Sequence, residues 1–218
     1  MIFVSYYSGK PYQICSDRLK KSLLKFDLPY NIEEIKNHGD KQKNISLKPE
    51  FFRYNLLKFR QPVCWIDADS EIVKYPELLM DRDSNDINLQ IYNWYGDADN
   101  HVTRVPKDIL YKISVWIKGN EYNSKNKLLC SSGTFAFNYS KESVDLLDQW
   151  ISEMRKNPHL PDDQVLDNIF NDGNWSKKIK YRWLPKSYNR MTRYNDWADV
   201  DPIINNTETD ECLISQSK

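Results

Sequence analysis

The sequence predicts a single α/β domain with a mostly parallel central sheet flanked by helices, and three observations support this prediction. First, the stretches 2–7 and 63–66 are apolar and β-rich, and the second shows no polar alternation, as expected for a strand covered on both faces. Second, segments with apolar residues at helical spacing lie between the predicted strands. Third, 218 residues with 40% hydrophobic content can bury one substantial core and suit one domain better than two.

The first half of the chain alternates predicted strands and helices. The strand at 2–7 ends at a glycine-containing turn, and Ser16 is expected to cap the helix that follows. A second strand spans 31–35, and after a polar stretch Pro49 opens another helix. This helix leads into the strand at 63–66, so a strand–helix–strand order is established early.

The second half of the chain carries weaker signals. An alternating run at 87–91 predicts a strand with one covered face, and Ser140 and Pro161 are expected to begin two amphipathic helices. The segment 105–118 fits a helix or a strand equally well. The other predicted elements are a short helix near 76–79, strand segments at 128–130 and 134–137, and a strand at 179–183.

The chain becomes polar and loses its periodicity after Pro185. Residues 205–218 form a polar tail that is interpreted as a linker or a frayed end. The domain is therefore assigned to residues 1–204.

Composition and charge exclude several classes of function. Lysine plus arginine and aspartate plus glutamate both number 31, so the net charge is zero and gives no general attraction to nucleic acid or anionic membranes. No signal-peptide pattern and no run of bilayer-spanning length occurs, so we expect a cytosolic protein without membrane insertion. The cysteines lack CxxC spacing, which argues against a zinc site and disulfides: Cys15, Cys64, Cys130 and Cys212.

Two aspartates, Asp67 and Asp69, directly follow the apolar strand, and a turn is expected at Ser70 and Glu71. Because side chains alternate along a strand, both carboxylates should point the same way, and such a pair favours a cation between them. Mg²⁺ or Mn²⁺ is the expected ion, because hard divalent cations prefer oxygen ligands. The same Asp-x-Asp spacing recurs in polar stretches typical of solvated loops, at 81/83, 97/99 and 199/201.

Several stretches together resemble one family. In chain order they are 51–57 (FFRYNLL), 63–72 (VCWIDADSEI), 75–79 (YPELL), 131–138 (SSGTFAFN), 162–166 (DDQVL) and 184–189 (LPKSYN). The set is similar to nucleotide-sugar-dependent glycosyltransferases with the GT-A fold, including glycosyltransferase domains of large chlorella-virus proteins. The resemblance implies a metal-dependent transfer of a hexose or deoxyhexose, with glucose or rhamnose favoured, from a UDP-sugar to a glycan or glycoprotein. A viral origin would place it in the host cytoplasm.

The resemblance also implies roles for the charged residues around the strand. Asp67 would reach the ribose, or the metal through water, while Asp69 would ligate the ion directly. Such an ion can stabilise the negative charge that develops on the leaving diphosphate. Arg53, on the preceding helix, would lie near the diphosphate or orient the aspartates. An exposed helix arginine is the alternative interpretation for Arg53.

Other candidates concern the nucleotide and the donor sugar. Tyr6, Tyr7 and Ser8 follow the first strand, where an aromatic ring can stack on uracil while backbone groups read its edge. Core tyrosines are the alternative. Ser132 and Gly133 are assigned to the donor sugar by resemblance.

The predicted helix at 162–166 supplies the catalytic candidates. Asp163 is positioned to accept or orient the proton of the attacking sugar hydroxyl, and Asp162 can exchange roles with it. Ordinary helix capping by these acids is the alternative. Gln164 is assigned to the donor sugar by resemblance.

One departure from the family concerns the metal. Many relatives supply a third ligand from a late histidine, but His38, His101 and His159 do not occupy that place. Asn205 or water is expected to complete the coordination shell, because Mg²⁺ and Mn²⁺ both tolerate water ligands.

Three other functions stay open at this stage. A haloacid-dehalogenase-type phosphatase also ends an apolar strand in Asp-x-Asp and would use Asp67 as nucleophile, although that family usually carries the motif on its opening strand. A sugar-phosphate nucleotidyltransferase would need a glycine-rich phosphate loop, which residues 8–11 do not form. A non-catalytic sugar-binding module is the third alternative. Further domains of a larger polypeptide are also compatible with the sequence.

Overall fold

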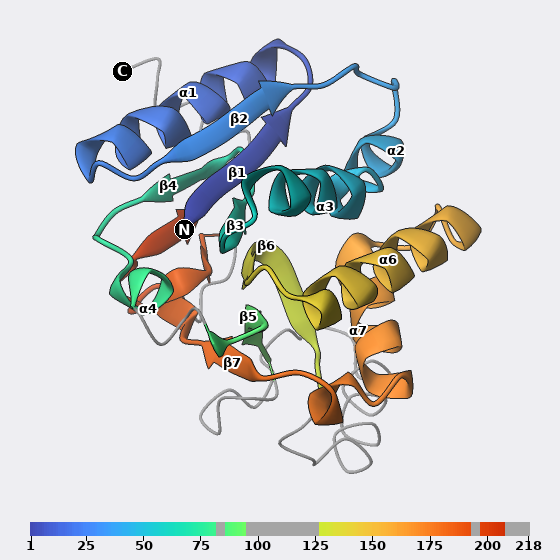
Figure 1. Ribbon diagram of the computed structural model, residues 1–218. Helices are drawn as coiled ribbons and strands as arrows, with labels where there is room; N and C mark the ends of the chain where they lie inside the picture. Colours follow the sequence, from blue (N-terminus) through green and yellow to red (C-terminus); the bar gives the residue numbers. More distant parts are fainter. Residues whose placement is uncertain (82–85, 95–126, 193–196, 208–218) are drawn as a thin grey trace, which may run out of the picture.

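The computed structural model describes residues 1–81, 86–94, 127–192 and 197–207. A six-stranded sheet lies at its centre, with the order β2-β1-β3-β6-β5-β7 (Figure 1). Strand β6 is antiparallel to both neighbours, whereas the remaining pairs are parallel. The prediction of one α/β domain with a mostly parallel sheet is confirmed. The strands are β1 (Ile2–Tyr7), β2 (Tyr30–Glu34), β3 (Val63–Ile66), β5 (Leu89–Asn93), β6 (Cys130–Phe137) and β7 (Tyr181–Leu184).

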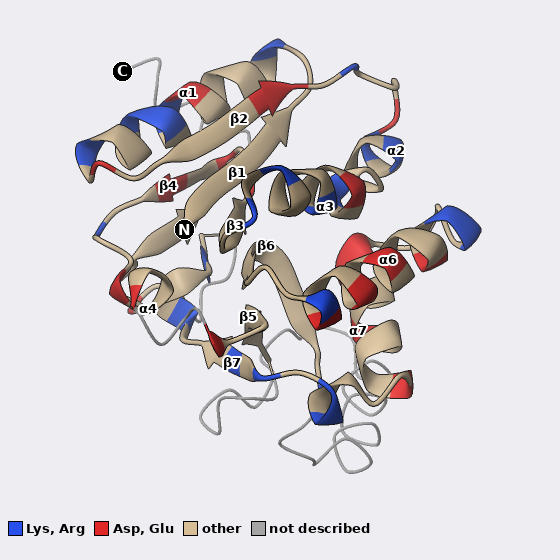
Figure 2. Ribbon diagram, in the orientation of Figure 1, with Lys and Arg blue, Asp and Glu red and all other residues tan. Residues whose placement is uncertain are grey.

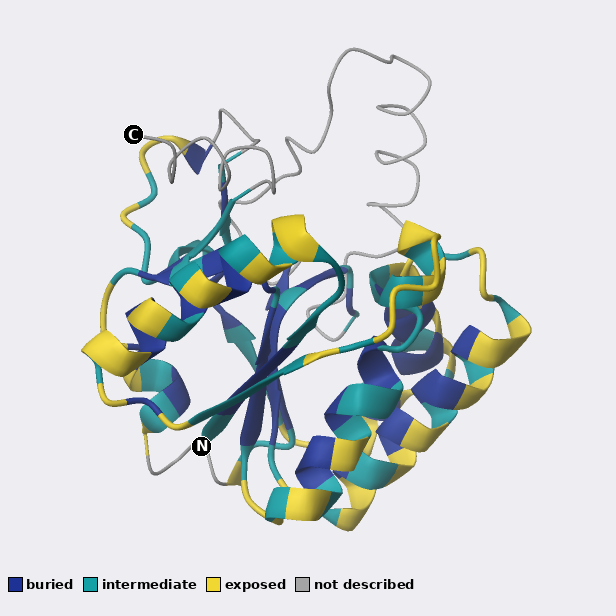
Figure 3. Cartoon of the chain, turned by 90° about the horizontal axis from the view of Figure 1, so that it is seen from above, coloured by how far each residue is buried: buried dark blue, intermediate teal, exposed yellow. Residues whose placement is uncertain are grey.

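Helices cover both faces of this sheet (Figures 1 and 3). Alternation along β3 shows the two layers, because Val63 and Trp65 join one core cluster while Cys64 and Ile66 join the other. The first cluster contains residues of α3 (Lys48–Phe59), α6 (Lys141–Lys156) and α7 (Asp162–Asp172). The second contains Leu19 and Leu23 of α1 (Lys10–Lys25). Strand β3 is therefore buried on both faces, as its unbroken apolar sequence predicts.

A second, three-stranded sheet joins distant parts of the chain. Strand β9 (Ile204–Asn206) pairs antiparallel with β4 (Ser70–Ile72) and parallel with β8 (Arg190–Met191). The expected turn at Ser70 and Glu71 is therefore wrong, and Asn205 and Asn206 lie in this sheet rather than in the tail. Such short strands lack periodicity of their own, since their pairing depends on partners far away in sequence. The short helices are α2 (Lys41–Ile45), α4 (Glu77–Met80) and the 3₁₀ segments Trp175–Lys177 and Lys186–Tyr188.

Several element boundaries differ from the predictions. Helix α1 begins at Lys10, and Ser16 is buried inside it, where its hydroxyl donates to the carbonyl of Gln13 rather than capping. The earlier start follows from Gly9, whose φ of 80° ends β1, and from the proline that follows in the first helical turn. All five residues of β5 are buried, so the prediction that this strand has only one covered face is also wrong. The two predicted strand segments, 128–130 and 134–137, belong to one strand, β6, which begins only at Cys130. The ambiguous segment 105–118 lies outside the described residues.

The distribution of charged residues and the placement of the cysteines complete the description of the fold. Residues of both charge signs lie along α1, α3 and α6 (Figure 2). Cys15, Cys64 and Cys130 are buried as thiols, while Cys212 lies outside the described residues. Within the described ranges, no helix combines the length and apolar character needed to cross a membrane.

Helix α6 begins as predicted, and its cap gives a test of the fold. The Ser140 hydroxyl accepts hydrogen bonds from the Ser143 amide at 3.1 Å and from the Asn88 side chain at 2.8 Å. Ser140→Ala should therefore lower the free energy of unfolding by about 1–2 kcal/mol, measured by urea denaturation. Ser152→Ala, an exposed change on the same helix, should stay within about 0.5 kcal/mol of the unmodified chain. Equal effects of both changes would contradict the capping role.

Candidate functional site

A cavity of about 710 Å³ opens beyond the carboxyl ends of β1 and β3. This edge of an α/β sheet is where ligands usually bind. The walls come from the loop after β1, the segment around α2, the turn after β3, strand β6, the start of α7 and strand β9. The lining includes Tyr6, Tyr7, Ser8, Tyr12, Lys48, Asp67, Asp69, Ser132, Gly133, Asp162, Asp163, Asn189, Asn206 and Thr207.

The two predicted metal-binding aspartates both line this cavity. They lie in a turn rather than in the strand, because β3 ends at Ile66 and the Ser70 amide donates to the Asp67 carbonyl at 3.0 Å. The Asp67 amide donates to the Gly133 carbonyl at 2.9 Å, which ties the start of the turn to β6. Both aspartates face the same cavity, as predicted. The cause is this turn, however, and not the alternation of side chains along a strand.

Lys48, which was not predicted, connects these aspartates with the start of α7. Its side chain is only 6% exposed, and its ammonium lies 2.8 Å from Asp162 Oδ2 and 3.2 Å from Asp67 Oδ1. It also donates to the Ser132 hydroxyl at 3.1 Å and to the Ser132 carbonyl at 3.3 Å. A lysine in the first turn of a helix opposes the helix dipole, and this unfavourable placement was the available sequence signal for nearby carboxylates.

The charges of this cluster shift the pKa values of its members. Burial alone would lower the pKa of Lys48, but the neighbouring carboxylates of Asp162 and Asp67 outweigh burial and raise it well above its ordinary value. Burial raises the pKa of Asp67, opposed by Lys48 and by the hydrogen bond from Trp65 Nε1 at 2.7 Å. More than a third of the Asp67 side chain (37%) is nevertheless exposed, on the cavity side. A cation entering the cavity would therefore reach Asp67 without displacing Lys48.

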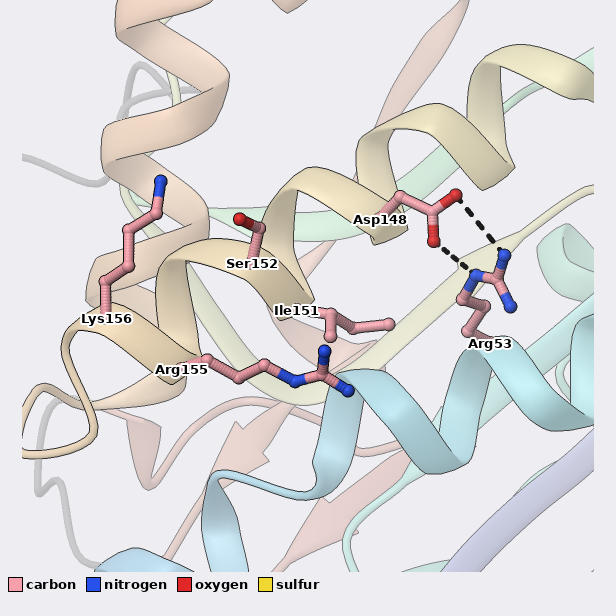
Figure 4. Close-up of a pocket in the computed structure, with 6 residues that line it drawn as sticks. All are labelled: Arg53, Asp148, Ile151, Ser152, Arg155 and Lys156. Atoms are coloured by element: carbon pink, nitrogen blue, oxygen red, sulfur yellow. Dashed lines mark hydrogen bonds and ion pairs between the residues drawn. The ribbon is translucent and has the colours of Figure 1, made fainter.

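Arg53 lies away from this cavity. Its guanidinium forms an ion pair with Asp148 in a shallow depression between α3 and α6, beside Arg155 and Lys156 (Figure 4). The Arg53 and Asp148 side chains are 32% and 51% exposed. The expectation that Arg53 approaches the diphosphate or orients the aspartates is not met, because the side chain points across to α6. Lys48, on the same helix, is the cation that contacts Asp67.

The three candidate residues at the start of α7 have different surroundings. Asp162 is buried against Lys48, and its carbonyl accepts from Trp150 Nε1 at 3.1 Å. Asp163 lines the cavity, and its Oδ1 accepts from the Gln164 amide at 2.8 Å within the first turn of the helix. The Gln164 side chain is exposed outside the cavity lining, which does not fit the expected contact with the donor sugar.

A pair of asparagines occupies the floor of the cavity beside Gly133. Asn206 donates to Asn189 at 2.7 Å and accepts from the Ser70 hydroxyl. A Cβ at Gly133 would lie 2.9 Å from the Asn189 side-chain oxygen, so any other residue there would have to displace this amide. Asn205, the predicted third ligand, lies outside the cavity lining and accepts from Arg190 at 3.0 Å. Alternation along β9 accounts for this difference, because Asn206 takes the cavity side.

The tyrosines after β1 divide between core and cavity. Tyr6 packs edge-on against Phe51 and Trp65, and its hydroxyl donates to the Asn44 carbonyl at 2.6 Å, which favours the core interpretation. Burial raises its pKa far above the ordinary range. Tyr7 lies under the Lys20 ammonium, 5.3 Å from the ring centroid. Ser8 accepts from Asn44 at 3.2 Å, and all three residues line the cavity. Tyr12, which was not predicted, lines it as well.

The donor set of the cavity suits a hard cation shared with a ligand. In the part of the chain that the structure describes, no group of three or more His, Cys, Asp or Glu side chains is arranged to hold a metal. Mg²⁺ in particular is often bound by one or two carboxylates together with substrate phosphates and water. Asp67 and Asp69 fit this pattern, with the Asn206 amide nearby.

Comparison with known proteins gives one consistent family. A family described as nucleotide-diphospho-sugar transferase matches residues 12–209. No curated protein matches the chain. A glycosyltransferase involved in the glycosylation of the major capsid of PBCV-1 has a TM-score of 0.67 at 10% identity, covering 100% of this chain and 98% of that one. The galactosyltransferase LgtC, in complex with donor and acceptor sugar analogs, has a TM-score of 0.51 at 13% identity, covering 95% and 87%. These structures share the fold.

The two cations of α3 allow a matched test of the Lys48 cluster. Lys48→Met should lower the free energy of unfolding by roughly 3 kcal/mol, because it leaves the buried Asp162 without its counter-charge. Arg53→Met removes an exposed ion pair and should cost less than about 1 kcal/mol. Urea denaturation of both variants gives the comparison. Equal losses would show that Lys48 contributes no more than a surface ion pair.

Proposed function

The chain belongs to the nucleotide-diphospho-sugar transferase family and is a glycosyltransferase with the GT-A fold, and we propose that it transfers a hexose or deoxyhexose from a UDP-sugar to a glycan or glycoprotein hydroxyl. Glucose and rhamnose are the favoured sugars. The observation that carries the proposal is the joining, in one cavity, of the Asp67–Asp69 turn, the Ser132–Gly133 strand and the start of α7. The Asp67–Asp69 turn would contact the diphosphate, the Ser132–Gly133 strand the donor sugar, and the start of α7 the acceptor.

The charge of the cavity supports a metal-dependent reaction. A diphosphate would enter an already negative site, because the lining has five carboxylates and two lysines. These residues are Asp40, Asp67, Asp69, Asp162, Asp163, Lys41 and Lys48. We assign Asp67 and Asp69 to Mn²⁺ or Mg²⁺, with Asn206, which lines the cavity, in place of Asn205. When bound, the ion would supply charge stabilisation for the leaving diphosphate.

Nucleotide binding is assigned to the side of the cavity formed by the loop after β1. Tyr7 and Tyr12 offer rings to a uracil base, and Ser8 and the backbone beside it offer hydrogen bonds. Tyr6 contributes by supporting this wall, since its ring and hydroxyl are already engaged with Trp65, Phe51 and Asn44.

Acceptor activation is assigned to Asp163 rather than to Asp162. Asp162 is buried, and one of its oxygens is held 2.8 Å from the Lys48 ammonium, so it is less open to an incoming hydroxyl. Asp163 lines the cavity and is partly exposed, so an acceptor hydroxyl can approach it. Lys48 acts by fixing Asp162 and Asp67 relative to Ser132.

The metal assignment is tested by removing one charge at a time. Asp67→Asn and Asp69→Asn should each lower kcat/KM for Mn²⁺-dependent release of UDP by at least about 100-fold, because a neutral amide is a weaker ligand for the ion. Asp201→Asn is the matched control, since Asp201 belongs to another Asp-x-Asp pair and its side chain is 76% exposed. Its activity should be unchanged.

The assay also separates the alternative functions. Release of phosphate from sugar phosphates that survives Asp69→Asn would indicate the phosphatase chemistry and overturn the transferase. Binding of UDP-sugars without any release of UDP, across a panel of acceptors, would indicate a binding module.

The two acids at the start of α7 should respond differently to substitution. Asp163→Asn should lower kcat at least tenfold with little change in unfolding free energy, because it removes the proposed base from a partly exposed position. Asp162→Asn should reduce stability as well, because it weakens the pairing of a buried lysine. Steady-state kinetics and urea denaturation of both variants check this. Full activity of Asp163→Asn would remove it from the reaction.

A further inference from the structure

We propose that Arg18 is a positioning residue that fixes the turn carrying Asp67 and Asp69. Arg18 lies on α1, opposite the strand β4 that follows this turn, and α1 packs against β4. The inference rests on the proposed function in one respect, because a fixed turn matters most if the two aspartates bind a cation.

Three hydrogen bonds form a closed network around the Asp69 carbonyl. Arg18 Nη2 donates to this carbonyl at 2.6 Å and also to the Thr207 hydroxyl. The Thr207 hydroxyl in turn donates to the same carbonyl at 2.5 Å. The donors and acceptors are consistent, because Nη2 carries two hydrogens and the hydroxyl accepts one bond while it donates another. The carbonyl of a proposed metal-binding residue is thus held from two directions.

A second contact from α1 holds the segment three residues further on. The Ile72 amide donates to the Ser22 hydroxyl at 3.0 Å, and Ser22 is buried. Arg18 and Ser22 are four residues apart on one face of the helix. Helix α1 therefore anchors the backbone at Asp69 and at Ile72, on either side of the start of β4.

Arginine suits this role for a chemical reason. Its guanidinium is always charged, and a hydrogen bond from a charged donor is stronger than a neutral one. The first residue of the turn, Asp67, is tied to β6 through the Gly133 carbonyl. Asp69 lies beyond β3, so Arg18 and Thr207 supply the corresponding support at the other end of the turn.

The hydrogen bonds of Arg18 do not satisfy all of its donors. Among the described residues, the buried Nε of Arg18 has no hydrogen-bond partner. Burying an unpaired donor is unfavourable, so the contacts of Nη2 must offset this cost. Arg18 also lies outside the cavity lining, which makes direct contact with a ligand an unsuitable explanation.

The test compares Arg18→Met, Arg18→Lys and Thr207→Val with a matched control. Arg182→Met removes another partly buried arginine that donates to a backbone carbonyl, that of Leu78 at 3.1 Å, away from the turn. Amide hydrogen exchange of a peptide covering residues 66–73 reports the turn directly. Titration with Mn²⁺ in the presence of UDP reports its effect on the cation.

Arg18→Met should speed exchange in residues 66–73 at least tenfold and weaken Mn²⁺ binding by about tenfold, which corresponds to about 1.4 kcal/mol. Turnover at saturating Mn²⁺ should fall by less than about threefold, because Arg18 touches no substrate. Arg18→Lys and Thr207→Val should give smaller changes in the same direction, and they carry the test if Arg18→Met does not fold. Arg182→Met should change neither quantity.

Unchanged exchange in residues 66–73 in the Arg18 and Thr207 variants would overturn the proposal. So would faster exchange spread evenly over the whole chain, which would indicate general destabilisation. Failure of the unmodified chain to bind Mn²⁺ would sink the metal assignment instead, while the exchange comparison would still decide whether Arg18 fixes the turn.

Discussion

The buried ammonium of Lys48 is the interaction on which the candidate site depends. It lies between two carboxylates that belong to different layers of the domain, one after β3 and one at the start of α7. Removing a lysine from water is unfavourable unless its partners are well placed, and here both carboxylates and a serine provide them. The Lys48 ammonium therefore holds together the start of α3, the carboxyl end of β3 and the start of α7. The cavity lies where these three segments meet.

Helices α3 and α7 begin with side chains of opposite charge. Helix α7 has Asp162 and Asp163 in its first turn, where acids are favourable, whereas α3 has a lysine in the equivalent place. The unfavourable lysine is stabilised by an acid from the neighbouring helix. A site that must accept an anionic diphosphate thus keeps most of its negative charge on the aspartates and one positive charge buried beneath them.

The elements predicted from sequence were those whose evidence is local. The two-sided burial of β3 follows from an unbroken apolar run, and the start of α6 follows from Ser140, because a serine cap acts within one turn. The start of α1 was misplaced because a glycine and a proline, rather than Ser16, set it. The small sheet of β4, β8 and β9 was missed, since its pairing joins residues far apart and leaves no periodic pattern.

The candidate site shows the same limit. Asp67, Asp69, Ser132, Gly133 and the start of α7 were found from motifs, and the structure brings them to one cavity. Arg53 lies on the helix that precedes the aspartates, but a helix has several faces, and its side chain is directed to Asp148 on α6 by what packs beside it. Asn205 was predicted as the third metal ligand, but the cavity is lined by the neighbouring Asn206, because one step along a strand moves a side chain to the opposite face.

The late position of β9 in the chain has a consequence for the order of folding. The contact between Ser70 and Asn206 spans 136 residues, and Thr207 reaches Asp69 over 138. Contacts across such separations form after local ones, because closing a long loop costs entropy before any bond repays it. During synthesis the aspartate turn would leave the ribosome long before the segment that completes it. The wall that this turn and β9 give to the cavity would therefore be completed only in the last stage of folding.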